Sequence, residues 1–224
     1  MQQPRTEQMA VFDPEGLSDW PQPVRWSILT GCKNPITAAR RAAALAERIT
    51  LDDSDEADRV RATVAAVLRC CLHAAARADC TVAQVRDWIE NRTNRTPVAI
   101  LELVFPAWAR ELSLLLAAAG TDDEAFEAAA RLFEPLTVPS RSAAVDAPPA
   151  ESFDLDRFMR SGPNTVYLVS RGTTDAMAAF TAVFAAEAHE AARQSSHTGA
   201  ARPDPTVWLT VGPDNPAPLH LAAA

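Results

Sequence analysis

The clearest partial motif for metal chemistry is His189-Glu-Ala-Ala-Arg193, which begins like the His-Glu-x-x-His helix of zinc proteases. In that motif two histidines one helical turn apart share the zinc ion, and the glutamate acts as general base. Arg193 stands here in the place of the second histidine, so the second ligand is absent. The other histidines are scattered, without a cysteine or carboxylate at ligand spacing. We therefore interpret 189–193 as a solvated helix face and expect no metal site.

The four cysteines are the next candidates for metal binding or redox chemistry. Cys70 and Cys71 are adjacent within a helical pattern, so their side chains point to different faces. Such a pair indicates neither a zinc site nor a disulfide framework. We interpret all four as reduced thiols that act as small buried hydrophobes. They are Cys32, Cys70, Cys71 and Cys80.

Phosphate binding by a P-loop requires Gly-x-x-x-x-Gly-Lys-Ser/Thr, whose backbone amides and ammonium group cradle the phosphates. Lys33 is the only lysine of the chain, and it lies in Gly31-Cys-Lys-Asn34 without the paired glycines or the hydroxyl. Asp13 follows an expected first strand, at a sheet edge where α/β proteins often bind ligands. Because the phosphate cradle is missing, a direct role for Asp13 is the lesser alternative. No catalytic or cofactor-binding residue is predicted.

Composition narrows the class of partner. The chain has 224 residues, 48% of them hydrophobic, with a net charge of −8 and a pI near 5.0. That charge argues against non-specific nucleic-acid binding, which usually requires a basic stripe. No apolar stretch approaches the roughly 20 residues that cross a bilayer, and the first residues lack a signal-peptide pattern. We expect a cytoplasmic protein without a membrane segment.

Several local signals predict helices in the first half of the chain. Asn34 and Pro35 are a helix start, with asparagine as N-cap and proline at the first helical position. Thr81-Val-Ala-Gln84 is a capping box, and Pro106 should kink or restart a helix. Apolar residues at helical spacing continue through this region. The sequence therefore predicts a compact all-helical block at residues 51–136.

The second half of the chain has a different pattern. Residues 139–152 are rich in Pro, Ala and Ser, which is typical of a linker. A continuous apolar run at 165–170, a long helix at 174–194 and a short apolar run at 207–211 predict a βαβ unit. With an expected strand at 9–13, this pattern predicts an α/β sheet domain into which the helical block is inserted.

Three stretches resemble one family when they are taken in order. They are VFDPEGLSDWPQPVRWSILTGCKNPITAARRAAAL (Val11 to Leu45), PPAESFDLDRFMRSGPNTVYLVSRG (Pro148 to Gly172) and VWLTVGPDNPAPL (Val207 to Leu219). They are similar to segments of actinobacterial type IV secretion coupling proteins, the TraG/TraD-like conjugation ATPases of the FtsK/HerA superfamily. The resemblance implies a partial RecA-like parallel sheet with an inserted all-alpha domain that contacts a relaxase or another secretion substrate.

The chain departs from this family at its catalytic positions. The family's last strand ends in an Asp-Glu pair that handles Mg²⁺ and water, where this chain has Val211 and Gly212. Asp214 lies beyond Pro213 and is displaced by several ångströms, at roughly 3.3 Å per extended residue. Since the P-loop is missing as well, we expect no ATP hydrolysis by this chain alone.

These observations lead to one expected function and one alternative. The first is a truncated, catalytically silent relative of a conjugation coupling ATPase, which binds a relaxase, another secretion substrate or a chain that supplies the missing ATPase strands. The alternative is a free-standing helical adaptor or structural protein unrelated to DNA transfer. Trp88 and Trp108 are core anchors or partly exposed partner-binding residues. The expected domains are 1–50 (first strand and helix), 51–138 (all-alpha), 139–152 (linker) and 153–224 (β-α-β).

Overall fold

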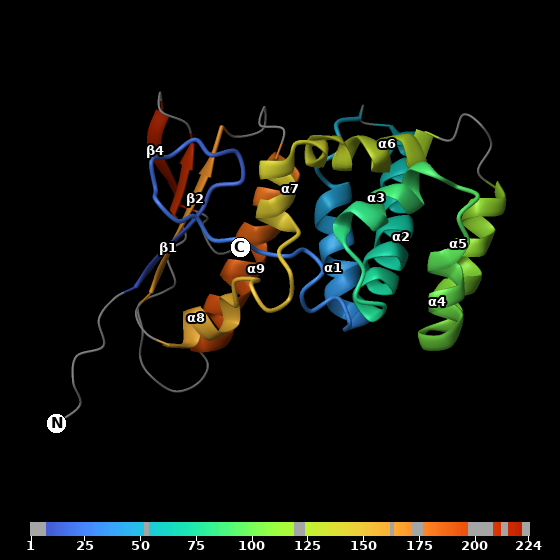
Figure 1. Ribbon diagram of the computed structural model, residues 1–224. Coiled ribbons are helices and arrows are strands. Elements are labelled where there is room, and N and C mark those ends of the chain that lie inside the picture. Colours follow the sequence, from blue (N-terminus) through green and yellow to red (C-terminus); the bar gives the residue numbers. More distant parts are fainter. Residues whose placement is uncertain are drawn as a thin grey trace. The chain divides into compact units, whose positions relative to one another are not determined.

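The computed structural model describes residues 8–51, 54–118, 124–161, 164–171, 177–196, 208–211 and 215–220. This part of the chain contains nine α-helices, one short 3₁₀-helix and four strands (Figure 1). In chain order they are β1 (Met9–Phe12), α1 (Pro35–Ala46), α2 (Asp55–Arg77), α3 (Val82–Glu90), α4 (Thr96–Val104), α5 (Pro106–Ala118), α6 (Glu124–Phe133), the 3₁₀-helix η1 (Glu134–Thr137), α7 (Pro139–Val145), α8 (Leu155–Ser161), β2 (Thr165–Ser170), α9 (Ala178–Ser196), β3 (Trp208–Val211) and β4 (Asn215–His220).

Contacts divide the chain into two compact units. The helical unit is the continuous segment Ser27–Asp146, which contains α1 to α7. The sheet unit combines Met1–Trp26 with Ala147–Ala224. The chain therefore leaves the sheet unit once, builds the helical unit without interruption and returns.

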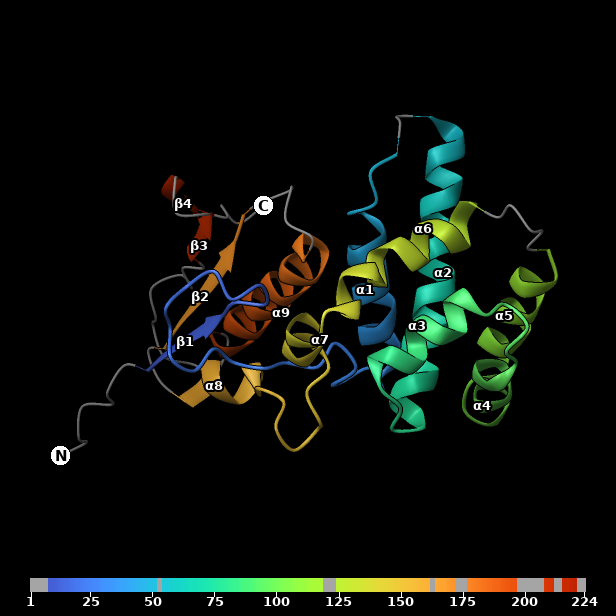
Figure 2. The ribbon, with the colours of Figure 1, turned by 45° about the horizontal axis from the view of Figure 1, so that its top comes forward.

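The helical unit is organised around α2, its longest helix. Ser54 caps this helix by accepting a hydrogen bond from the Ala57 amide at 3.2 Å. Acidic residues fill its first turn and Arg77 its last, which complements the helix dipole at both ends. Helices α1, α3, α4, α5 and α6 all pack against α2. Two views place α1 on one side of α2 and the α4–α5 pair on the other (Figures 1 and 2).

The two ends of the helical unit meet. The Ile28 amide donates to the Val145 carbonyl at 3.0 Å, and the Val82 amide donates to the Asp146 carboxylate at 3.0 Å. Val145 is fully buried at the end of α7, in the stretch that its composition predicted as a linker. Residues 139–145 are therefore a packed helix of the helical unit.

The sheet unit has strands in the order β1-β2-β3-β4. The first three are parallel, and β4 returns antiparallel to β3. Helix α9 packs against β2, and the ring of its Phe184 stacks on Phe12 of β1 with centroids 4.1 Å apart. The rings of Trp26 and Phe184 are nearly perpendicular, with centroids 5.4 Å apart. These aromatic contacts form the core of the unit.

The predicted α/β class, with a partial RecA-like parallel sheet, is wrong. The described residues are mostly helical, and the strands among them are only four to six residues long. A doubly wound sheet carries helices on both faces. The described part of the sheet unit has two helices, α8 and α9, which pack on each other. Helix α1, which was expected behind the first strand, packs on α2 instead.

The RecA-like prediction was wrong because the βαβ sequence pattern on which it rests covers only a short part of the chain. A βαβ unit is present, since β2 and β3 are parallel and α9 lies between them in the chain. That pattern is local, and it does not determine how many further strands join the sheet. It is therefore compatible with a small sheet in a chain that also contains a helical unit, as well as with a RecA-like domain.

Candidate functional site

Trp108 lies where α5 rests on α2. Its ring centre is 4.7 Å from that of Phe105, and its ring meets the His73 imidazole edge-on at 5.4 Å. His73 is buried, and its Nδ1 donates to the Cys32 carbonyl at 2.8 Å. This imidazole is consequently held by a backbone carbonyl and two aromatic rings. Trp108 thus attaches the α4–α5 pair to the rest of the helical unit.

Arg69 lies over the Trp108 ring and forms an ion pair with Glu111. The Arg69 guanidinium carbon lies 5.5 Å from the ring centre, and the same guanidinium forms an ion pair with Glu111. Both charged side chains are about one-third exposed, at 31% and 35%. At that exposure an ion pair contributes about 0–1 kcal/mol, and a cation–π contact adds about 0.5–1 kcal/mol. Both contacts therefore contribute little to the stability of the fold.

The neighbouring thiol is unreactive. The Cys70 Sγ lies 3.7 Å from the Trp108 carbonyl oxygen. Burial, together with the Glu111 carboxylate, raises the pKa of Cys70 to about 12, although Arg69 acts in the opposite direction. Burial also raises the pKa of Cys71. Because the thiolate is the nucleophile and the metal ligand, neither thiol is suited to catalysis at neutral pH.

The outer side of α4 and α5 exposes large apolar side chains. Leu103 is 87% exposed and Leu114 is 65% exposed, although both lie on well-packed helices. The exposed residues around them recur at helical spacing on α5, and the two helices lie side by side beyond α2 (Figures 1 and 2). We call this surface the α4–α5 face. It consists of Ala99, Glu102, Leu103, Ala107, Arg110, Leu114 and Ala117.

The two tryptophans predicted as partner-binding residues occupy different environments. Trp88 is 4% exposed and lies in the core, on α3. Trp108 is partly exposed and sits beneath Arg69. The leucines of the α4–α5 face were missed because α4 is apolar on nearly every side. Its periodicity therefore could not show which residues face solvent.

The nucleotide-related positions carry no assembled chemistry in the described residues. Asp13 accepts hydrogen bonds from the Leu17 amide at 2.9 Å and from the Ser18 amide and hydroxyl at 2.7 Å, so both its oxygens hold a turn. Val211 is the last residue of β3. Gly212 lies outside the described residues, as does Asp214.

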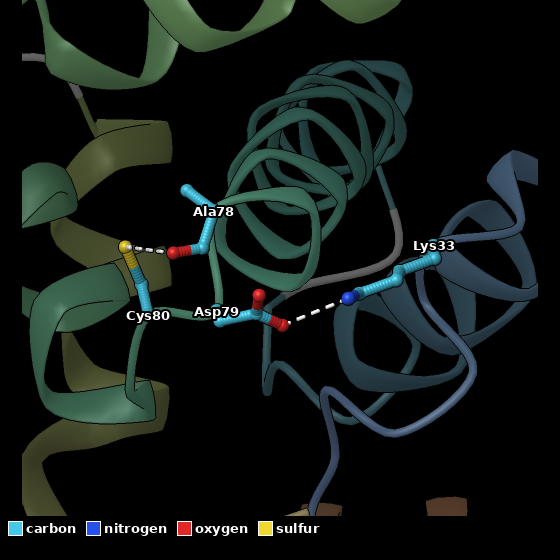
Figure 3. Close-up of polar contacts among 4 residues, drawn as sticks. All are labelled: Lys33, Ala78, Asp79 and Cys80. Atoms are coloured by element: carbon cyan, nitrogen blue, oxygen red, sulfur yellow. Dashed lines mark hydrogen bonds and ion pairs between the residues drawn. The ribbon is translucent and has the colours of Figure 1, made fainter.

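Lys33 belongs to a solvated ion pair. Its Nζ lies 2.8 Å from the Asp79 carboxylate, and both side chains are more than half exposed (Figure 3). Cys80 lies beside this pair, with its Sγ 3.9 Å from the Ala78 carbonyl oxygen. Partial burial and the Asp79 charge raise the pKa of the Cys80 thiol. The group therefore resembles neither a phosphate cradle nor an activated cysteine.

The partial zinc motif on α9 is an ion-pair site. Glu190 lies 3.3 Å from Arg193 and accepts a hydrogen bond from Gln194 at 2.9 Å. Throughout the described ranges, no three His, Cys, Asp or Glu side chains gather into a possible metal site. Within those same ranges, no helix has the length and apolar character needed to cross a membrane.

Comparisons with known proteins add no assignment. Neither a protein-family model, nor a curated protein sequence, nor a solved structure matches this chain. Among the described residues, the α4–α5 face is the main candidate for a functional site, because it exposes Leu103 and Leu114 to solvent.

Proposed function

We propose that this chain is a protein-binding module and that the α4–α5 face is its docking surface. The observation that carries the proposal is the exposure of Leu103 and Leu114 on helices whose inner residues are well buried. Leu101 and Leu112, on the same two helices, are at most 1% exposed. Helices α4 and α5 thus have one apolar side packed against the rest of the helical unit and a second apolar side exposed to solvent.

The energetics favour such a role. Burying a leucine side chain completely contributes about 1.5–3 kcal/mol. Two leucines closed off by a partner therefore supply a large share of a micromolar affinity, which corresponds to about −8 kcal/mol. Hydrophobic anchors surrounded by polar residues are the usual anatomy of a contact surface. The proposed compartment is the cytoplasm, because all four cysteines are free thiols.

The class of partner rests on the sequence resemblance. If the resemblance to coupling proteins reflects descent, the partner is a relaxase or another protein substrate of a conjugation system. In the adaptor alternative, the face binds a protein unrelated to DNA transfer. Neighbouring reading frames distinguish the two, since a relaxase gene or a P-loop ATPase segment beside this gene favours the conjugation partner.

A photoreactive amino acid at Ala107, in the middle of the face, tests the docking function in cells that naturally contain the chain. We expect a specific cross-linked protein, which is then purified for an affinity measurement. Leu103→Gln combined with Leu114→Gln should weaken its binding by about 10- to 100-fold, because glutamine preserves the helices but removes the apolar contact.

Ile36→Gln is the matched control, because Ile36 is 73% exposed on α1, away from the face. It should leave the affinity of the captured protein unchanged. Equal binding by the native chain and the double leucine variant would contradict the docking function.

A further inference from the structure

The two charged residues of the α4–α5 face have no ion-pair or hydrogen-bond partner among the residues that the structure describes. Glu102 on α4 and Arg110 on α5 are exposed, and neither makes an ion pair or side-chain hydrogen bond with any residue that the structure describes. Some exposed charges of the helical unit do pair along one helix, as Arg59 does with Glu56 on α2. The face therefore presents one free carboxylate and one free guanidinium beside its two leucines.

We propose that the partner seated on the α4–α5 face is a second copy of this chain, related to the first by a two-fold axis. This inference rests on the proposed docking function of the same face. In an isologous contact the same patch is used by both copies, so residue i meets j and j meets i. Glu102 of each copy then lies against Arg110 of the other, and Leu103 and Leu114 are buried at the centre.

Self-complementarity favours this partner over an unrelated helix. An acidic helix would attract Arg110 but repel the Glu102 carboxylate. A basic helix would attract Glu102 but repel the Arg110 guanidinium. A second copy supplies one charge of each sign in equal number. The partner must therefore carry both signs, and this chain does so by symmetry.

The net charge of −8 opposes the approach of two copies only weakly. Exposed charges separated by more than about 8 Å are largely screened at physiological ionic strength. The Glu102–Arg110 contacts are short-range, and the α4–α5 face itself is neutral. Local complementarity therefore outweighs the long-range repulsion once the copies meet.

The size of the face predicts a weak dimer. Helix α5 has 13 residues, which corresponds to about 20 Å of helix length. Two helices side by side, at about 10 Å each, give a footprint on the order of 400 Å² per copy. Stable interfaces bury about 800 Å² per partner. We therefore expect monomer and dimer to exchange, with the dimer favoured at tens to hundreds of micromolar.

Sedimentation velocity of the full chain over about 1–300 µM tests the proposal. The native chain should shift from monomer to dimer as concentration rises. Arg110→Glu places carboxylates opposite each other and should weaken the dimer by at least about 10-fold, as should Glu102→Arg. The combined exchange of both charges should restore dimerisation to within about threefold of native.

Arg131→Glu is the matched control, because Arg131 is exposed on α6 and makes no ion pair with any residue that the structure describes. It should not alter the dimer, and thermal melts of every variant should show that the fold is kept. A native chain that stays monomeric over the whole range overturns the proposal, as does a dimer that the single reversals leave unchanged. If the chain is monomeric but Ala107 still cross-links another protein, only the choice of partner is overturned and the docking function stands.

Discussion

Cys70 and Cys71 lie next to each other on α2. The pKa of each thiol is raised well above its ordinary value of 9.0, so both thiols stay protonated at alkaline pH. Burial is the main cause for both, and it holds the pKa of Cys70 at about 12. The unfolded chain releases these protons near pH 9, whereas the folded chain retains them. Their stabilising contribution is therefore complete below pH 9 and is lost as the pH rises toward 12.

The alkaline stability of the protein should depend on these thiols. Above pH 9 each thiol should lower the free energy of unfolding by about 1.4 kcal/mol per pH unit. The chain has a single lysine and a single tyrosine, so few other groups titrate in this range. Urea unfolding between pH 8 and 11 measures the slope, which should be clearly shallower in Cys70→Ala. Identical slopes in Cys70→Ala and the native chain would show that the thiol is not protected.

Helices α4 and α5 form a hairpin, and Trp108 makes several of the contacts that hold it on the rest of the helical unit. Trp108→Ala removes the ring that meets His73, Phe105 and the Arg69 guanidinium. We expect a loss of about 2–3 kcal/mol, below the value for a fully buried tryptophan because the ring is partly exposed. Hydrogen exchange should increase in residues 96–118 more than in α2.

Leu114→Ala serves as the comparison for Trp108→Ala. It changes the outer side of the same helix, where Leu114 is 65% exposed, and should alter stability by no more than about 0.5 kcal/mol. A uniform rise of exchange across the whole helical unit in Trp108→Ala would mean that the hairpin does not open separately.

At the scale of elements, the sequence was informative where one local contact decides the structure. Asn34 caps α1 by accepting from the Ile36 amide at 2.9 Å, and Thr81 and Gln84 form the predicted capping box. Helix α5 begins at Pro106, where a restart was predicted. Each signal spans at most four residues. Helix α7 was missed because its Pro-, Ala- and Ser-rich sequence resembles a linker, and its burial depends on distant residues.

At the scale of the whole molecule, local sequence patterns could not show which helices and strands belong to which unit. The α4–α5 face shows the same limit, because Leu101 and Leu103 are chemically identical, yet one is fully buried and the other is 87% exposed. That difference is set by α2, which is separated from α4 in the chain by α3 and packs on one side of α4. The βαβ pattern was likewise correct for β2, α9 and β3 and uninformative about the size of the sheet.

The helical unit should fold without the sheet unit. It is one continuous segment, its two ends are joined by the Ile28–Val145 hydrogen bond, and α2 lies within its own buried core. A chain of about 120 residues is also long enough to bury such a core. We expect the fragment 27–146 to melt cooperatively, with a near-ultraviolet circular dichroism signal from Trp88 and Trp108. A helical fragment without that signal would be a molten state, and the sheet unit would then be needed for fixed packing. Cooperative folding would instead allow dimerisation through the α4–α5 face to be measured on the fragment alone.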